Sequence, residues 1–493
     1  MNSFQEDVKK HPYKCLAPSF QRIDDLTLSD NFRIFTPKDS LVNDCEISLS
    51  KSSTKHKFQF EIKLKQQIVP WSKFSFEQFG LNQELALLGN EKSLNASAKS
   101  VTKISLSLGT KEKDYKSLLG ELSELDSTQV DNSSYFHRII VPTEKEVETT
   151  LISGTSYTDK KTIYGYGLVT VLIDGNSYHM YRFSNRDNKK FYLILESLQK
   201  VSFETFSLDT DSAIKALSLI TGNWYGDERY IVRSSEQLFN TIDSIHFRTA
   251  SYSIISGHKI IDPHGFVEYM KAMGRSEFKN STSVVPAISF SRICAMMKHV
   301  DELERSLFLI LEGNKSKSPM SRITSYLVAL ETLASSISSK YPEHFKTIKN
   351  SKLSGKVRNS LIKKLEDYKD DLPPNEYELM TRKLQNINSP SNMDKILKSF
   401  ELFGIKLPPK MKKIIKTRNV FLHGKTPFEE NEVKEKQKEL GIDSLRMHML
   451  VSVLFLKFCG YSGHIKNLAG WRLYDDNRTD PNFELTEGIY FTI

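Results

Sequence analysis

The sequence predicts an α+β protein, in which a β-rich N-terminal part is followed by an all-α helical bundle. From about residue 32 to residue 206, short runs rich in Val, Ile, Tyr, Phe and Thr alternate apolar with polar residues, as half-buried strands do. After Pro286 the apolar spacing changes to that of amphipathic helices. The chain of 493 residues is also too long for one ordinary core, which predicts two or three domains.

We expect four segments along the chain. Residues 1–24 are a loosely ordered lead-in, 25–285 the β-rich domain, 286–466 the helical bundle, and 467–493 a tail that packs back as an extended arm. The boundary near residue 285 rests on the Ser-Thr-Ser run that precedes Pro286, because a proline disfavours helix in the residue before it.

In the N-terminal part, the Asp174-Gly175 step between two alternating runs predicts a tight β-hairpin. Residues 212–220 and 235–245 have helical spacing, and residues 91–100 and 126–134 have the polar composition of surface loops. The runs predicted as strands are 56–64, 101–108, 165–173, 178–183, 189–195 and 200–208.

The bundle is expected to contain several helices with local start and stop signals. Ser318-Pro319 combines a capping serine with a first-turn proline, and Pro408-Pro409 opens a helix that ends near Gly424. The other predicted helices cover residues 289–311, stopped by Gly313-Asn314, and residues 354–370, 375–386, 391–403 and 443–458.

The positive charge is concentrated in the bundle. Residues 287–470 hold 32 Lys and Arg against 20 Asp and Glu, a balance of +12, whereas the rest holds 37 against 40, a balance of −3. A phosphate backbone is therefore the expected ligand of this part, with solvated lysine-rich helix faces as the alternative.

The composition also indicates the cellular compartment. The four cysteines form no C-x-x-C pair, so a zinc site or a disulfide framework is not expected and a reducing cytosol fits best. The first ten residues carry no apolar signal core, and the longest apolar run, 447–458, is too short to cross a bilayer. The sequence therefore predicts a cytoplasmic protein that does not bind membranes.

The chemistry is concentrated between Lys416 and Gly424, where Arg418, Asn419 and His423 lie within six residues. Cleaving RNA without a metal requires a base, an acid and a cation beside the phosphate. A histidine can move protons near neutral pH, and an arginine can hold two phosphate oxygens at once. The surrounding lysines Lys412, Lys413, Lys416 and Lys425 are the candidate RNA-binding residues.

The spacing leaves two interpretations of this motif open. Asn419 and His423 share a helix face, but Arg418 lies about 140° around an ideal helix from His423. Both can reach one phosphate only where the helix is irregular, or where a two-fold related copy completes the pocket. In the alternative interpretation, Arg418 binds the C-terminal dipole of a neighbouring helix and His423 caps its own helix.

With these residues, the part from about 287 to 464 resembles the HEPN superfamily (higher eukaryotes and prokaryotes nucleotide-binding), and more narrowly its ApeA-like branch. The resemblance rests on Arg418-Asn419-Val420-Phe421-Leu422-His423-Gly424, on the helix Tyr326 to Leu333, and on the approach Ile405 to Pro408. In the β-rich half it rests on Ala216 to Gly222.

The resemblance implies a metal-independent endoribonuclease of bacterial anti-phage defence, acting by abortive infection, with no cofactor. It implies a homodimer or higher homo-oligomer, RNA (tRNA included) as substrate, and a phage-derived trigger. By the same resemblance Arg418 and His423 are catalytic, Asn419 is the polar residue beside the arginine, and Glu331 orients that arginine. The competing interpretation is a non-catalytic RNA- or nucleotide-binding dimerisation module.

Two other clusters have alternative interpretations. His258, Asp262 and His264 could belong to a metal site, but no further ligand with suitable spacing follows, which favours a surface turn. Trp224 and Arg229 could stack on a base, although aromatic residues in a β-rich half are more often part of the core.

Overall fold

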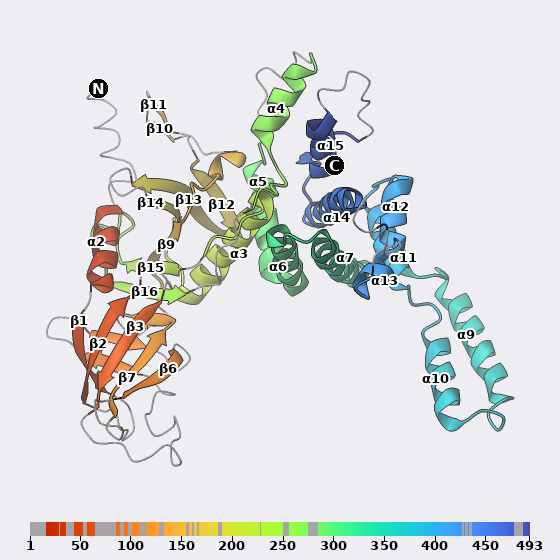
Figure 1. Ribbon diagram of the computed structural model, residues 1–493, viewed down its shortest axis with the longest axis horizontal. Helices are drawn as coiled ribbons and strands as arrows, with labels where there is room; N and C mark the ends of the chain where they lie inside the picture. Colours follow the sequence, from red (N-terminus) through yellow and green to blue (C-terminus); the bar gives the residue numbers. More distant parts are fainter. Residues whose placement is uncertain are drawn as a thin grey trace. The chain divides into compact units, whose positions relative to one another are not determined.

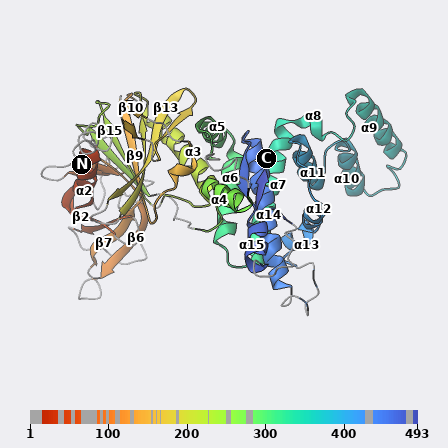
Figure 2. The same ribbon diagram turned by 90° about the horizontal axis from the view of Figure 1, so that it is seen from above.

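A computed structural model of the chain confirms the α+β prediction (Figures 1 and 2), with a mainly antiparallel sheet in the N-terminal half and mainly helices in the C-terminal half. Two compact units divide the chain. Unit 1 contains Met1–Leu217, Trp224–Ser253 and Pro286–Ala295, and unit 2 contains Ser218–Asn223, Ile254–Val285 and Met296–Ile493. The structure describes residues 16–28, 30–35, 44–52, 57–64, 85–88, 93–96, 101–108, 115–127, 133–153, 157–159, 162–164, 167–185, 190–226, 228–249, 256–274, 284–425, 428, 432, 436–477 and 487–493.

A large antiparallel sheet organises unit 1. Within the described ranges it has fourteen strands in the order β12-β13-β14-β9-β15-β16-β8-β5-β4-β1-β2-β3-β7-β6. Alternate residues are buried in β1, β2 and β3, where one face packs on the core, whereas β9, β14 and β15 bury most of their residues. The strands are β1 (Asp30–Phe35), β2 (Cys45–Lys51), β3 (Phe58–Lys63), β4 (Leu85–Leu88), β5 (Ser93–Ala96), β6 (Val101–Leu108), β7 (Tyr115–Leu122), β8 (Glu124–Asp126), β9 (Phe136–Thr143), β12 (Val169–Ile173), β13 (Asn176–Asn185), β14 (Lys190–Ser197), β15 (Glu228–Ser234) and β16 (Ser244–Thr249).

The hairpin predicted at Asp174-Gly175 is confirmed. Ile173 at the end of β12 pairs with Asn176 at the start of β13, so the two residues between them form the whole turn. Asp174 has a φ of 49° and Gly175 a φ of 86°. Positive φ at both central residues is the requirement of a type I′ turn, which matches the twist of the two strands.

Two predicted elements of the N-terminal half are wrong. The run 200–208 is not a strand, because α3 (Phe203–Thr221) begins within it. Ser202 accepts a hydrogen bond of 3.1 Å from the backbone N–H of Thr205, a cap that a strand interpretation overlooks. Residues 235–245 are not a helix. They form a loop around the buried Phe239, closed by the Asp243 carboxylate, which accepts from the Ser235 N–H at 2.6 Å, and they lead into β16.

Smaller corrections concern segments expected to lack regular structure. The lead-in contains α2 (Leu16–Thr27), whose buried residues include Leu16, Ile23 and Leu26. The expected loop at 91–100 contains the four-residue strand β5. Two further short elements, β10 (Tyr157–Asp159) and β11 (Thr162–Tyr164), pair with each other, and a 3₁₀ turn η5 covers Thr149–Leu151.

Unit 2 is built around two long helices, α7 (Pro319–Lys340) and α14 (Gln437–Phe458), which pack on each other. The Ser318 hydroxyl accepts from the Ser321 N–H, and Pro319 occupies the first turn, so the predicted start of α7 is confirmed. The other helices of the described chain are α4 (Pro263–Ala272), α5 (Ala287–His299), α6 (Asp301–Lys315), α8 (Pro342–Phe345), α9 (Ser351–Glu366), α10 (Pro374–Gln385), α11 (Asn392–Leu402), α12 (Pro409–Lys416), α13 (Arg418–Leu422) and α15 (Leu468–Asn477).

Three predicted boundaries in the bundle change. The helix expected over 289–311 is two helices, because Val300 adopts an extended conformation (φ −129°, ψ 95°) between α5 and α6. Gly313-Asn314 does not stop the second of them, since both residues are buried inside α6. The tail is not simply extended. It contains α15, followed by β18 (Tyr490–Thr492), which pairs with β17 (His464–Lys466).

The described residues contain no helix that is long and apolar enough to cross a membrane.

Candidate active site

The segment that carries the Arg418–His423 motif begins with the short helix α12. Pro409 lies in its first turn, where the missing N–H costs nothing. Its buried side chains are Met411, Ile414 and Ile415, and its lysines are exposed. This separation of apolar and basic faces attaches the helix to the bundle by one side and leaves its charge in solvent.

The predicted single helix is interrupted at Thr417, where α12 ends and α13 begins. The Thr417 hydroxyl donates a 2.8 Å hydrogen bond to the carbonyl of Ile414, and such back-bonding bends helices. The N–H of Val420 bonds to the carbonyl three residues back, at Thr417, rather than four. The helix is therefore irregular one residue before Arg418, but this break does not change the angle between Arg418 and His423, which both follow it.

The end of α13 is a Schellman motif that matches the predicted role of Gly424. The Gly424 N–H bonds to the carbonyl of Phe421 and the Lys425 N–H to that of Val420, each at 3.0 Å. Gly424 has a φ of 71°, which favours glycine. His423 is therefore held at the last position before the chain turns away, and its side chain is exposed.

Tertiary contacts fix α13 on α7, which lies beside it in Figure 1. The buried Phe421 provides the apolar contact, and its carbonyl accepts a 3.5 Å hydrogen bond from the Thr324 hydroxyl. Seven residues further along α7, Glu331 forms an ion pair and hydrogen bond with the Arg418 guanidinium. The side chains of the arginine and the glutamate are 14% and 23% exposed, so the pair is largely sheltered from solvent.

Arg418 and His423 lie in different surroundings. Arg418 is half-buried against α7, whereas Asn419 and His423 are exposed. The His423 N–H bonds to the Asn419 carbonyl at 3.1 Å, so these two residues are one helical turn apart. No hydrogen bond joins the Arg418 and His423 side chains, both of which belong to the described residues. One copy of the chain thus holds the arginine and exposes the imidazole.

The candidate RNA-binding lysines surround this short helix. Lys412, Lys413, Lys416 and Lys425 are all exposed. Residues 409–425 contain six Lys and Arg residues and no Asp or Glu, and Glu331 of α7 pairs with the arginine among them. A local excess of positive charge that keeps no acidic neighbours along the chain suits a polyanion.

Sequence reasoning missed a pair of neighbouring histidines inside unit 2, formed by His258 and His448. The ring of His448, on α14, lies 5.6 Å from that of His258 and 5.4 Å from that of Tyr326. His448 is 1% exposed, and neither of its ring nitrogens has a hydrogen-bond partner among the described residues. The apolar run 447–458 indicated a buried helix but not a histidine pair, because His258 is 190 residues away in sequence.

Burial controls the titration of these two rings. Burial, and then the charge of Arg322, lower the pKa of His258 to about 4. Burial also lowers the pKa of His448 far below its ordinary value, with smaller effects from His258 and Arg322. Both rings are therefore neutral at physiological pH, which removes them as solvent-linked proton shuttles.

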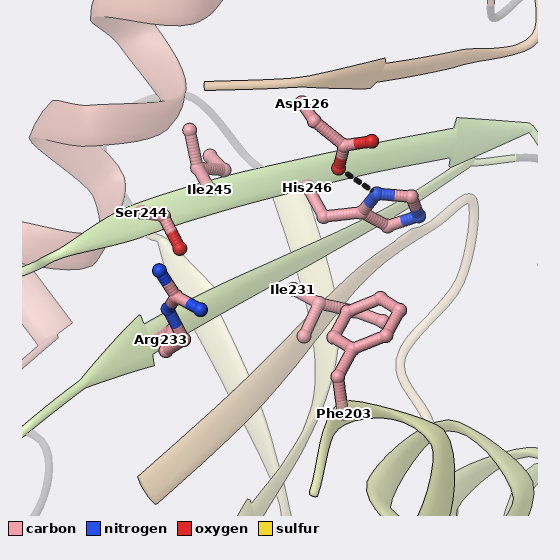
Figure 3. A pocket seen from close by; sticks show the side chains of 7 residues that line it. All are labelled: Asp126, Phe203, Ile231, Arg233, Ser244, Ile245 and His246. Atoms are coloured by element: carbon pink, nitrogen blue, oxygen red, sulfur yellow. Dashed lines mark hydrogen bonds and ion pairs between the residues drawn. The ribbon is translucent and has the colours of Figure 1, made fainter. Parts of the chain in front are cut away.

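The hollow in unit 1 shown in Figure 3 does not provide a competing site. His246 of β16 contacts Asp126 of β8 across it, and Arg233 of β15 and Phe203 of α3 point into the same space. Its volume of about 10 Å³ holds at most one water molecule. A histidine–aspartate pair here is a structural contact between neighbouring strands.

The two clusters with alternative interpretations are both structural. Trp224 and Arg229 are 3% and 2% exposed, so the core interpretation is confirmed. Asp262 caps α4 and forms a 2.9 Å ion pair with Lys466, so its carboxylate already has two structural partners. The described part of the chain contains no group of three or more His, Cys, Asp or Glu side chains that could hold a metal ion.

Comparison with protein-family models, with curated proteins and with solved structures finds no match to this chain.

Proposed function

We propose that the protein is a metal-independent endoribonuclease of the HEPN type, in which Arg418 and His423 carry the reaction. The observation that supports this best is the arrangement of α13. A short helix with no acidic residue holds an arginine against Glu331 at its start and an exposed histidine at its end. The exposed lysines of α12 add the charge that a phosphate backbone requires.

The proposed reaction is attack of the ribose 2′-oxygen on the adjacent phosphorus. The 2′-O–P bond forms, the P–O5′ bond breaks, and a 2′,3′-cyclic phosphate and a free 5′-hydroxyl result. The proton leaves the 2′-hydroxyl to a base and another is delivered to the 5′-oxygen, both within the capacity of an imidazole such as His423. The Arg418 guanidinium would stabilise the charge that develops on the non-bridging oxygens.

Glu331 and Asn419 have supporting roles in this proposal. Glu331 is a positioning residue, because its carboxylate restricts the Arg418 side chain to one direction. Asn419 shares the exposed side of α13 with His423 and would bind the substrate beside it. Since Arg418 and His423 diverge by about 140° on an ideal helix, a second copy of α13 would supply the missing partner of each.

The biological setting follows from the family resemblance alone and is part of the proposal. It is a cytoplasmic defence protein of bacteria that cuts RNA, tRNA included, once a phage-derived signal activates it. The β-rich unit would sense that signal or restrain the nuclease.

A second candidate is a non-catalytic RNA- or nucleotide-binding module. The observation that favours it is the half-buried ion pair itself, because an arginine already neutralised by Glu331 is well suited to holding two helices together. It predicts salt-dependent RNA binding without any cleaved product.

Incubation of the purified chain with total RNA in EDTA tests the proposal, with products resolved on a denaturing gel. We expect cleavage of RNA, none of an oligonucleotide lacking the 2′-hydroxyl at the scissile position, and a loss of about 10²–10⁴-fold in His423→Ala. Lys145→Ala, at an exposed lysine that follows β9, is the control for a loss of surface charge elsewhere. Unchanged cleavage by His423→Ala would refute the assignment, and binding without cleavage would support the second candidate.

A further inference from the structure

The helical hairpin formed by α9 and α10 is the least covered part of unit 2. The two helices lie side by side at one end of the unit (Figures 1 and 2), and each makes extensive contacts only with the other among the described elements. α9 buries a single residue, Leu365, and α10 buries none. We call residues 351–387 the arm.

Hydrogen bonds join the two ends of the arm at its root. The Asn388 amide bridges to the other side of the root, where its oxygen accepts from the Ile348 N–H at 2.6 Å and its nitrogen donates to the Ile348 carbonyl at 3.1 Å. Lys398 donates a 3.0 Å hydrogen bond to the Phe345 carbonyl nearby. The arm is thus a helical hairpin closed at its root, with little core of its own.

Large apolar side chains remain in solvent on this projection. The described residues include seventeen exposed large hydrophobic side chains, and six of them lie in the arm. Two helices that expose an apolar surface of this kind normally bury it against another element. The six are Leu353 (50% exposed), Leu361 (38%), Tyr368 (51%), Leu379 (48%), Met380 (44%) and Ile387 (38%).

The distribution of charge along the arm indicates which kind of partner binds its exposed apolar side chains. Residues 351–365 contain five Lys and Arg and no acidic residue, whereas residues 366–378 contain six Asp and Glu and one Lys. The two segments therefore carry +5 and −5. Near the tip, Lys364 already pairs with Asp367 at 2.8 Å. Near the root, Lys352, Lys356 and Arg358 have no ion pair within the described chain, and neither do Asp370 and Asp371 at the tip.

From these observations we propose that the arm is a self-association surface that pairs with the same arm of a second copy in a two-fold, antiparallel four-helix bundle. In this arrangement the basic root of each α9 faces the acidic tip of its partner, and the exposed leucines and Met380 form the shared core. α9 has sixteen residues, which span roughly 24 Å, enough to separate root from tip. The inference goes beyond the proposed nuclease function and does not depend on it.

A charge-reversal exchange on the full chain tests the pairing. One variant carries Lys352→Glu and Lys356→Glu at the root, and the other carries Asp370→Lys and Asp371→Lys at the tip. Each variant alone places like charges together, so we expect self-association at least about tenfold weaker than for the unchanged protein. The mixture restores both contacts and should form a one-to-one complex, as measured by sedimentation velocity.

The apolar contact has its own test and control. Leu361→Glu should weaken self-association, whereas Leu208→Glu, at an exposed leucine of α3 outside the arm, should not. Circular dichroism checks that all variants retain the helix content of the unchanged chain.

Four outcomes would overturn the proposal. The RNA-free protein could be monomeric at every concentration, both reversed variants could associate as the unchanged protein does, or their mixture could fail to combine. Association that requires RNA and is lost after nuclease treatment would also overturn it, and would assign the basic root to nucleic acid instead.

Discussion

Two histidines of unit 2 show how differently the fold treats the same side chain. His423 ends a five-residue helix and is exposed beside Asn419, and Arg418 of that helix is paired with Glu331. His448 lies in the middle of α14, 1% exposed, against the rings of Tyr326 and His258. The first is accessible to solvent and the second is not. An arginine near a histidine is therefore a candidate catalytic site only where the imidazole remains exposed to solvent.

The largest expected effect is the difference in stability between the variants that remove the buried and the exposed histidine ring. We expect His448→Ala to lower the free energy of unfolding by about 2–4 kcal/mol, because it leaves a cavity in the core of the bundle. His423→Ala should change it by less than about 0.5 kcal/mol, because the side chain is exposed. Urea unfolding followed by circular dichroism measures both. Equal destabilisation by the two variants would break the comparison.

Low pH should destabilise the folded protein through the histidines His258 and His448. The folded pKa values of His258 and His448 are depressed, so below about pH 6.5 the unfolded chain binds protons that the folded chain excludes. The stabilisation is complete above pH 6.5 and is lost as the pH falls towards 4, at up to about 1.4 kcal/mol per pH unit for each ring. Urea midpoints between pH 7 and pH 4.5 measure this slope.

The matched variant for the acid test is His258→Gln, which removes one titrating ring. Its slope should be shallower than that of the unchanged chain. A slope that does not respond to His258→Gln would show that other groups control acid stability.

The ion pair of Arg418 offers a smaller but more specific test. Arg418→Glu and Glu331→Arg each place like charges together and should lower the free energy of unfolding by about 1–2 kcal/mol, between the values of surface and buried pairs. The double exchange should recover most of that loss. The double variant should not cleave RNA, because its guanidinium then extends from α7 and not from α13, where the proposed reaction requires it. Cleavage by the double variant would argue against a catalytic Arg418.

The smallest effect concerns the turn after His423. Gly424→Ala should lower the free energy of unfolding by about 1 kcal/mol, since a φ of 71° disfavours any side chain although nothing lies within 4 Å of the added methyl group. Gly441→Ala, inside α14 and equally unobstructed, should raise it by up to about 1 kcal/mol. Thermal unfolding distinguishes the two, and the same sign for both would contradict the assigned turn.

Much of the fold could be predicted because its signals are local. The β12–β13 turn at Asp174-Gly175, the capped start of α7 at Ser318 and the end of α13 at Gly424 depend on side chains within a few residues. The failures occurred where a short pattern fitted two structures. The run 200–208 alternates like a strand, yet the cap at Ser202 and the packing of Phe206 in the core make it a helix.

The sequence by itself determined which residue types lie together between Lys416 and Gly424, and where the helix that carries them ends. Only the tertiary structure decided that Glu331, 87 residues away, meets Arg418, and that His448 is buried while His423 is exposed. The physical reason is range. Turns and caps are formed by hydrogen bonds between near neighbours, whereas burial and ion pairing depend on which distant helix packs against each side chain.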